Sequence, residues 1–143
     1  MSELSDLVQK HYNEINTQDY SDAAEVFSGD VETVSPGAPV SQGIDAFIAY
    51  SQAFHTAFPD GQIKADSQIE SGDTIVVEGH FTGTNTGPLR GPAGELPPTG
   101  RRLDMRFSDI FQTKDGRVVS HRIYFDQMEM LTQLGLAPTG SNG

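Results

Sequence analysis

Asp126 is the residue whose type and position most directly suggest chemistry. It follows a run of β-branched and aromatic residues at 118–125, which predicts a strand opened by the turn Asp115-Gly116. A short helix is expected directly after it, over residues 127–134. A carboxyl group that pointed into an apolar cavity at this junction could exchange protons near neutral pH. The same position also suits a simple helix cap.

Four further polar residues are candidate contacts for a substrate. Tyr12 and Tyr124 could donate hydrogen bonds to a carbonyl or an enolate, or could be packed in the core with satisfied hydroxyls. His55 and Ser51 fall on the apolar face of a helix expected over residues 43–57. They could line a pocket, and the alternative for His55 is a core histidine bonded to a backbone carbonyl.

The period-two spacing of a strand assigns the remaining candidates to one or the other face of the predicted sheet. Arg122, Tyr124 and Asp126 lie at even separations and should share one face, while His121 falls on the opposite face, at a dimer interface or on the outer side of the sheet. A cation at Arg122 would favour the charged form of the acid, which suits water activation. Asp109 interrupts the apolar face of its own predicted strand and is a second acid candidate, with a buried structural role as the alternative.

Composition narrows the classes of function. The chain has 143 residues, 20 acids against 9 bases and a net charge of -11, which argues against nucleic acid or anionic membrane surfaces as partners. There are no cysteines, and the N-terminus has acids without an apolar segment, so a cytoplasmic protein without a signal peptide is expected. No histidine spacing of a metal site or glycine-rich phosphate loop is present.

The secondary structure expected to position these residues changes along the chain from helices to strands. Helical periodicity covers three segments, near 4–15, 20–27 and 43–57, with a short strand expected at 31–34. Strands are then expected at 62–69, 74–84, 101–113 and 117–125, with a long Gly- and Pro-rich loop at 85–100. This layout is α+β, with three N-terminal helices packed against a curved, mostly antiparallel sheet. We expect a single domain over 1–137 and a disordered tail at 138–143.

Five motifs follow one another along the chain: Phe81-Thr82-Gly83-Thr84-Asn85-Thr86-Gly87, Pro97-Pro98-Thr99-Gly100-Arg101-Arg102, Asp109-Ile110-Phe111, Asp115-Gly116-Arg117-Val118-Val119 and Asp126 followed by Met130-Leu131-Thr132-Gln133-Leu134-Gly135. In this order they resemble the motifs of the SnoaL-like polyketide cyclases of the nuclear-transport-factor-2-like superfamily, over about residues 7–135. Tyr12 of the first helix also fits this pattern.

The resemblance implies a cone-shaped barrel, a homodimer across the sheet and a hydrophobic small-molecule substrate. It implies Asp126 as the general acid/base of an intramolecular aldol ring closure, with no metal or organic cofactor. The candidate pocket residues around this acid are Tyr12, His55, Tyr124, Arg122 and Ser51. The family commonly has Trp where this chain has Arg122. That departure favours other chemistry on the same fold, by a hydrolase, isomerase or hydroxylase with an Asp/Arg site. A non-catalytic ligand-binding module is a separate alternative.

Overall fold

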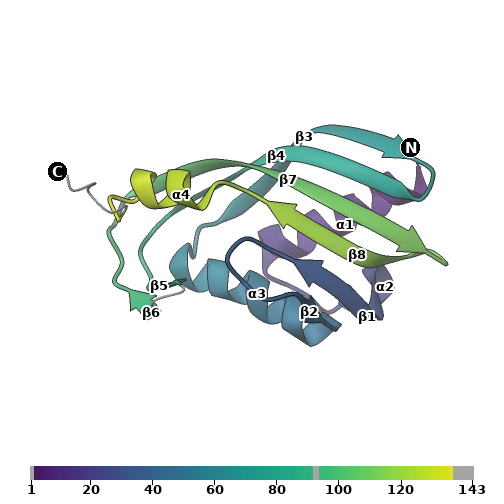
Figure 1. Ribbon diagram of the computed structural model, residues 1–143, viewed down its shortest axis with the longest axis horizontal. Coiled ribbons are helices and arrows are strands. Elements are labelled where there is room, and N and C mark those ends of the chain that lie inside the picture. The colour runs from purple at the N-terminus through teal and green to yellow at the C-terminus, as the bar shows by residue number, and fades with distance from the viewer. Residues whose placement is uncertain (1, 92–93, 137–143) are drawn as a thin grey trace.

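A six-stranded sheet with the two long helices on one of its faces forms the frame of the molecule (Figure 1). The computed structural model describes residues 2–91 and 94–136. The helices are α1 (Glu3–Thr17), α2 (Ala23–Val26), α3 (Ile44–Ala57) and α4 (Gln127–Gln133). The strands are β1 (Phe27–Val34), β2 (Ser41–Gln42), β3 (Gln62–Ser71), β4 (Thr74–Thr84), β5 (Leu89–Gly91), β6 (Gly94–Leu96), β7 (Arg102–Lys114) and β8 (Arg117–Tyr124).

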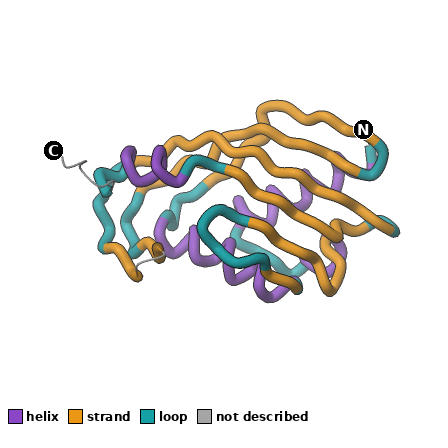
Figure 2. The backbone as a smooth tube through the Cα atoms, in the orientation of Figure 1, coloured by secondary structure: helices purple, strands orange, loops and turns teal. Residues whose placement is uncertain are grey.

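The strand order of the large sheet is β2-β1-β8-β7-β4-β3. The β1–β8 pair is parallel and the other pairs are antiparallel. Figure 2 shows the long strands bending over the helices, so that the sheet is curved. The expected α+β class, with N-terminal helices against a curved and mostly antiparallel sheet, is therefore confirmed.

Strand β7 shows how the sequence assigns the two faces of the sheet. Its side chains alternate between buried and more exposed along the strand, as period-two patterning requires. The buried face packs toward the helices, where burying each large apolar side chain contributes about 1.5–3 kcal/mol. Its members are Leu103, Met105, Phe107, Asp109 and Phe111. One acid, Asp109, thus lies on the inner face of the sheet.

A β-bulge near the start of β8 decides which of its residues face inward. Gln112 of β7 pairs with Ser120, but the next residue, Thr113, pairs with Val118, so Val119 is an extra residue without a partner. In a regular strand Val118 would share a face with Arg122. The bulge instead places Val118 on the same face as His121, and both are buried.

The structure differs locally from the expected elements in three places. Helix α2 is a single turn, and β1 begins at Phe27, four residues earlier than expected. The expected loop at 85–100 contains a short hairpin of β5 and β6. The proposed tail at 138–143 lies outside the described residues. No helix among the described residues is both long enough and apolar enough to cross a membrane.

Glu14 of α1 is a buried acid whose titration should make stability depend on pH. It is 6% exposed, and neither carboxylate oxygen has a hydrogen-bond partner. Burial, followed by the nearby charges of Asp22 and Asp19, raises the pKa of Glu14 to about 7. Its unfolded pKa is about 4.3, so folding favours the protonated form. The stability this contributes is complete below pH ~4 and is lost as pH rises through ~7.

Replacing Glu14 by Gln is therefore expected to flatten this part of the pH profile. The melting temperature of Glu14→Gln should exceed that of the wild type at about pH 8 and approach it near pH ~4, measured by thermal unfolding across that range. Glu32→Gln is the matched control, because Glu32 is exposed on β1 and is not among the charges that act on the pKa of Glu14. A difference between Glu14→Gln and wild type that did not change with pH would contradict the assignment.

Candidate functional site

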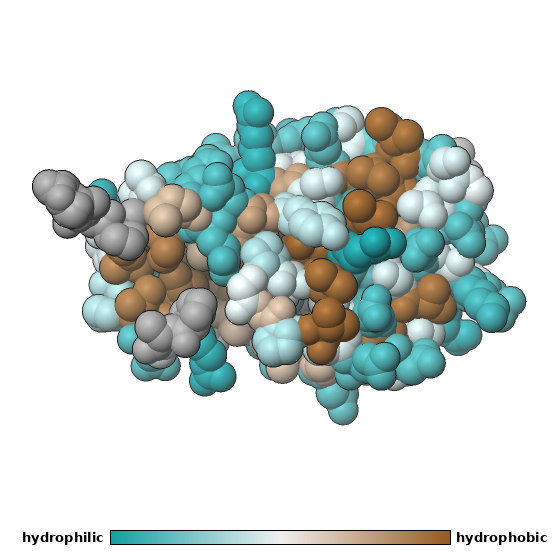
Figure 3. All heavy atoms as spheres, viewed as in Figure 1, coloured by the Kyte–Doolittle hydropathy of each residue, from teal (hydrophilic) through white to brown (hydrophobic). Residues whose placement is uncertain are grey.

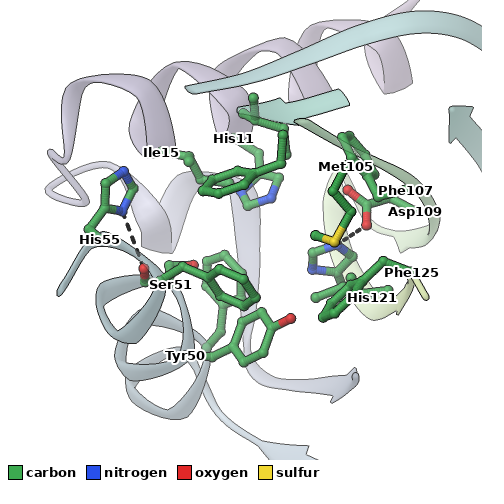
Figure 4. A pocket seen from close by; sticks show the side chains of 15 residues that line it. His11, Ile15, Tyr50, Ser51, His55, Met105, Phe107, Asp109, His121 and Phe125 are labelled. Atoms are coloured by element: carbon green, nitrogen blue, oxygen red, sulfur yellow. Dashed lines mark hydrogen bonds and ion pairs between the residues drawn. The ribbon is translucent and has the colours of Figure 1, made fainter. Parts of the chain in front are cut away.

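A cavity of about 70 Å³ lies between the inner face of the sheet and helices α1 and α3 (Figure 4). Its wall is mostly apolar and aromatic, with a few polar side chains on two opposite sides. The lining residues are His11, Ile15, Phe47, Tyr50, Ser51, Phe54, His55, Ile63, Phe81, Met105, Phe107, Asp109, His121, Ile123 and Phe125. Arginine and lysine are absent from this set of described residues. The arrangement is that of a ligand pocket, with few polar groups in an apolar wall.

Among the described residues that line the cavity, Asp109 is the only one with a carboxylate. It is 2% exposed, and its Oδ2 accepts a hydrogen bond of 2.8 Å from the Tyr12 hydroxyl. Its Oδ1 lies 3.5 Å from His121 Nε2 on the neighbouring strand, with which it shares the inner face. A buried carboxylate needs such partners, because an isolated charge is costly in an apolar environment. Figure 4 shows Asp109 and His121 pointing toward one another.

Tyr12 contacts Asp109 but is not among the residues that line the cavity, which corrects its expected placement as a pocket residue. Burial, followed by the charge and the hydrogen bond of Asp109, raises the pKa of the Tyr12 hydroxyl, so the group stays protonated and keeps donating. Burial, followed by the charge of His121, lowers the pKa of His11 well below its usual value. His11 is therefore a neutral ring, and it packs edge-on against His121 at a centroid distance of 5.2 Å.

Tyr50 is a polar residue of the wall that the sequence patterns did not single out. It rises from α3 and turns its hydroxyl toward the side of the cavity where His121 lies (Figure 4). Burial, followed by the charge of Asp109, raises the pKa of Tyr50, which keeps this hydroxyl a donor. Its spacing from Phe47 and Phe54, three and four residues away, was the signal that it shares their face.

His55 and Ser51 lie on the opposite side of the cavity, as expected from the apolar face of α3. Both are buried, and His55 Nδ1 lies 3.2 Å from the backbone carbonyl oxygen of Ser51. Because a carbonyl can only accept, Nδ1 must carry the proton in this arrangement.

Asp126 lies outside the cavity, which corrects the position expected for it. Its side chain is exposed and accepts hydrogen bonds from the backbone N–H groups of Met128 (2.9 Å) and Glu129 (3.1 Å) at the start of α4. This is the geometry of an N-cap. The physical reason is the strand's parity: Phe125 lines the cavity, so the side chain after it points away.

Arg122 and Tyr124 share the outer face of the sheet with Asp126, as their even spacing predicted. Tyr124 is 47% exposed, and neither residue lines the cavity. The expected placement of these two as pocket residues is therefore corrected as well. His121, expected at an interface or on the outer side of the sheet, is instead 2% exposed and lines the cavity.

The free volume limits what can bind without movement. An apolar cavity of roughly 150 Å³ holds a benzene ring, about twice the volume found here. A ring system can therefore enter only if side chains of the wall move, and Phe54 and Phe125 are two partly exposed members of that wall. Within residues 2–91 and 94–136, no group of three or more His, Asp or Glu is arranged to hold a metal ion.

Comparison with known proteins places this site in a family context. Residues 6–134 match the family described as SnoaL-like polyketide cyclase. The aklanonic acid methyl ester cyclase DnrD of Streptomyces peucetius is 29% identical over 140 residues, covering 94% of this chain and 92% of that protein.

Solved structures show the same fold at lower sequence identity. TsrD from Streptomyces laurentii superposes with a TM-score of 0.82 at 23% identity, covering 94% of this chain and 96% of that one. IdmH from Streptomyces antibioticus gives 0.79 at 26% identity, covering 92% and 97%. An NTF2-like protein of unknown function from Burkholderia pseudomallei gives 0.77 at 23%, covering 94% and 98%.

Proposed function

Because the chain belongs to the SnoaL-like polyketide cyclase family, we propose that it catalyses an intramolecular aldol ring closure of a hydrophobic, oxygenated small molecule by acid/base chemistry without a cofactor. The observation that supports this most is Asp109, a carboxylate buried in an aromatic-lined cavity. We assign the acid/base role to Asp109 in place of Asp126, whose carboxylate is engaged in capping α4.

In the proposed reaction, Asp109 takes one proton from the substrate and later returns one proton to it. Asp109 removes a proton from the carbon next to a substrate carbonyl, and the resulting enolate carbon attacks a second carbonyl of the same molecule. One carbon–carbon bond forms, and the new alkoxide takes the proton from Asp109, so the product is an isomer of the substrate. The Tyr50 hydroxyl is suited to donate a hydrogen bond to the enolate oxygen.

The residues around Asp109 would assist the reaction by positioning its carboxylate and by excluding water. The Tyr12 hydroxyl fixes the position of Oδ2, which leaves Oδ1 on the side of His121. The enclosing aromatic side chains exclude water, which strengthens electrostatic interactions with the reacting atoms. The Asp/Arg alternative lacks support from this arrangement, since Arg122 lies on the outer face of the sheet.

We also propose that two chains pair through the outer face of the sheet. Ile69, Val76 and Ile110 are cross-strand neighbours on β3, β4 and β7, and Ile69 is 71% exposed. In Figure 3 apolar side chains gather above this part of the sheet. Burying such a row would contribute free energy to a homodimer.

A direct assay tests the reaction. The probe is aklanonic acid methyl ester, the compound after which the relative DnrD is named. We expect a product of equal mass and different retention, detected by liquid chromatography with mass spectrometry. A product heavier by one oxygen or one water would contradict cyclisation and favour hydroxylation or hydration. A complete lack of turnover of this ester and of a small aliphatic diketone would count against the proposed reaction.

A further inference from the structure

Part of the cavity wall is formed by side chains that are partly exposed to solvent, whereas the rest of the wall is buried. The partly exposed members are Tyr50, Phe54, Ile63 and Phe125. A buried wall residue can move only by displacing the core around it, because protein interiors are close-packed. A partly exposed side chain can instead turn out into the water. We call these residues the mouth of the cavity, because a larger molecule can enter only past them.

An outward turn of one aromatic side chain would give the cavity the room that it lacks. The closed cavity has about 70 Å³, against roughly 150 Å³ for a cavity that binds benzene. A mouth ring that turned outward would vacate the space of one ring next to this volume. Ile63 has no ring and would vacate less. The candidates for the moving side chain are therefore Tyr50, Phe54 and Phe125.

Phe54 is the most firmly held of these three rings. It lies on α3 in the middle of the mouth and packs against aromatic rings on several sides. These rings are Tyr50, Phe58, Phe81 and Phe125, at centroid distances between 5.3 and 6.4 Å. Each aromatic pair stabilises the packed position. An outward turn of Phe54 would break all of these pairs at once.

Tyr50 is held at its ring and at its hydroxyl. The ring packs edge-on against Phe54, with the centroids 5.3 Å apart. The hydroxyl points toward the side of the cavity where His121 lies (Figure 4), and it interacts with the side chain of the buried Ser35. An outward turn of Tyr50 would lose both interactions.

Phe125 is the least firmly held ring of the mouth. Among the aromatic rings of residues 2–91 and 94–136, it packs against Phe54 alone, edge-on at 5.9 Å. Its backbone is fixed on both sides, because Tyr124 ends the β8 ladder opposite Ser108 and Asp126 caps α4. The ring can therefore rotate about its own side-chain bonds without disturbing the sheet or the helix.

We infer that Phe125 is the specificity-determining residue of the cavity. With its ring turned inward, the cavity admits only molecules that fit about 70 Å³. With its ring turned outward, a molecule the size of one ring can reach the wall that carries Asp109. The meaning of this gate for a substrate rests on the proposed function, because the molecule that enters would be the one cyclised. The entry of a ring does not itself depend on that reaction.

Fluorobenzene and xenon are the probes, because a benzene-sized ring exceeds the closed cavity and a single xenon atom is much smaller. Each is titrated into the full-length chain, and binding is followed by ¹⁹F or ¹²⁹Xe NMR. Phe125→Ala should bind fluorobenzene about threefold to tenfold more tightly than the wild type, which must first break the aromatic pair with Phe54. Xenon should gain no affinity, since it does not need the mouth to open.

Tyr124→Ala is the control variant, because it removes the neighbouring aromatic side chain, which is exposed and does not line the cavity. It should bind both probes as the wild type does. Phe125→Leu repeats the test with less loss of packing and should also tighten fluorobenzene binding. Unchanged affinity in both Phe125 variants, an equal gain for xenon, or a larger gain in Phe54→Ala would each overturn the assignment.

Binding and turnover separate this inference from the proposed reaction. Asp109→Asn should still bind fluorobenzene, so a failure of cyclisation would leave the role of Phe125 standing. A missing gain in the Phe125 variants would in turn leave cyclisation of the ester untouched.

Discussion

Replacing Asp109 by Asn is expected to reduce turnover of the cyclised substrate by roughly a thousandfold, within the range for losing a general acid/base. Asparagine has nearly the same shape, and its carbonyl oxygen can still accept from the Tyr12 hydroxyl, so the fold should persist. What is lost is the group that can take a proton from carbon and return it to oxygen. The measurement is kcat with the isomerisation assay, beside thermal unfolding of both proteins.

Asp126→Ala is the matched comparison, because it removes the other acid that the sequence brings forward. Loss of an N-cap should lower stability by about 1 kcal/mol while kcat stays within about twofold of the wild type. The reverse pattern, with turnover lost in Asp126→Ala and kept in Asp109→Asn, would show that the exposed acid carries the chemistry and that Asp109 is structural.

Gly87→Ala should destabilise the chain by at least about 2 kcal/mol, the largest effect on stability that we expect. A Cβ atom at Gly87 would collide with the backbone carbonyl oxygen of Thr56, near the end of α3. The collision involves backbone on both sides, so no side-chain rotation relieves it. Gly87 also donates its N–H to the Ala57 carbonyl at 3.3 Å, a contact that the displaced loop would lose.

Chemical denaturation of Gly87→Ala and wild type measures this effect. Gly29→Ala is the control, because a Cβ there meets no atom within 4 Å and the glycine has no positive φ. Gly29→Ala should therefore unfold like the wild type. Equal stability of Gly87→Ala and wild type would mean that the loop after β4 can move away from α3 at little cost.

The fold was largely predictable because its periodic signals are strong. The alternation along 101–113 and the helical spacing over 43–57 each predicted an element close to the observed one. The parity of residues 121–126 was also predicted. The hairpin of β5 and β6 was missed, since its two strands have three residues each and show no periodicity.

The candidate site was harder to predict, because spacing assigns residues to faces but does not say which face encloses the cavity. The apolar residues Ile123 and Phe125 marked the inner face of β8, yet the family motif drew attention to Asp126 on the other one. Asp109 did stand out as an acid on an apolar face. The contact of Tyr12 with Asp109 could not be read from the chain, because it joins residues that are 97 positions apart. The contact of His121 was missed for another reason: spacing alone did not show that the face carrying His121 is the inner one.

The bulge at Val119 gives the chain one spare residue between the β7–β8 turn and His121. A strand that lost this residue could close into a regular ladder with His121 still facing inward. Changes in the length of the hairpin can thus be absorbed before they reach the Asp109–His121 pair. A one-residue deletion after His121 could not be compensated in this way, because every following side chain of β8 would then point to the opposite face of the sheet. A one-residue deletion at the bulge should accordingly leave the cavity wall in register, whereas a one-residue deletion between His121 and Phe125 should not.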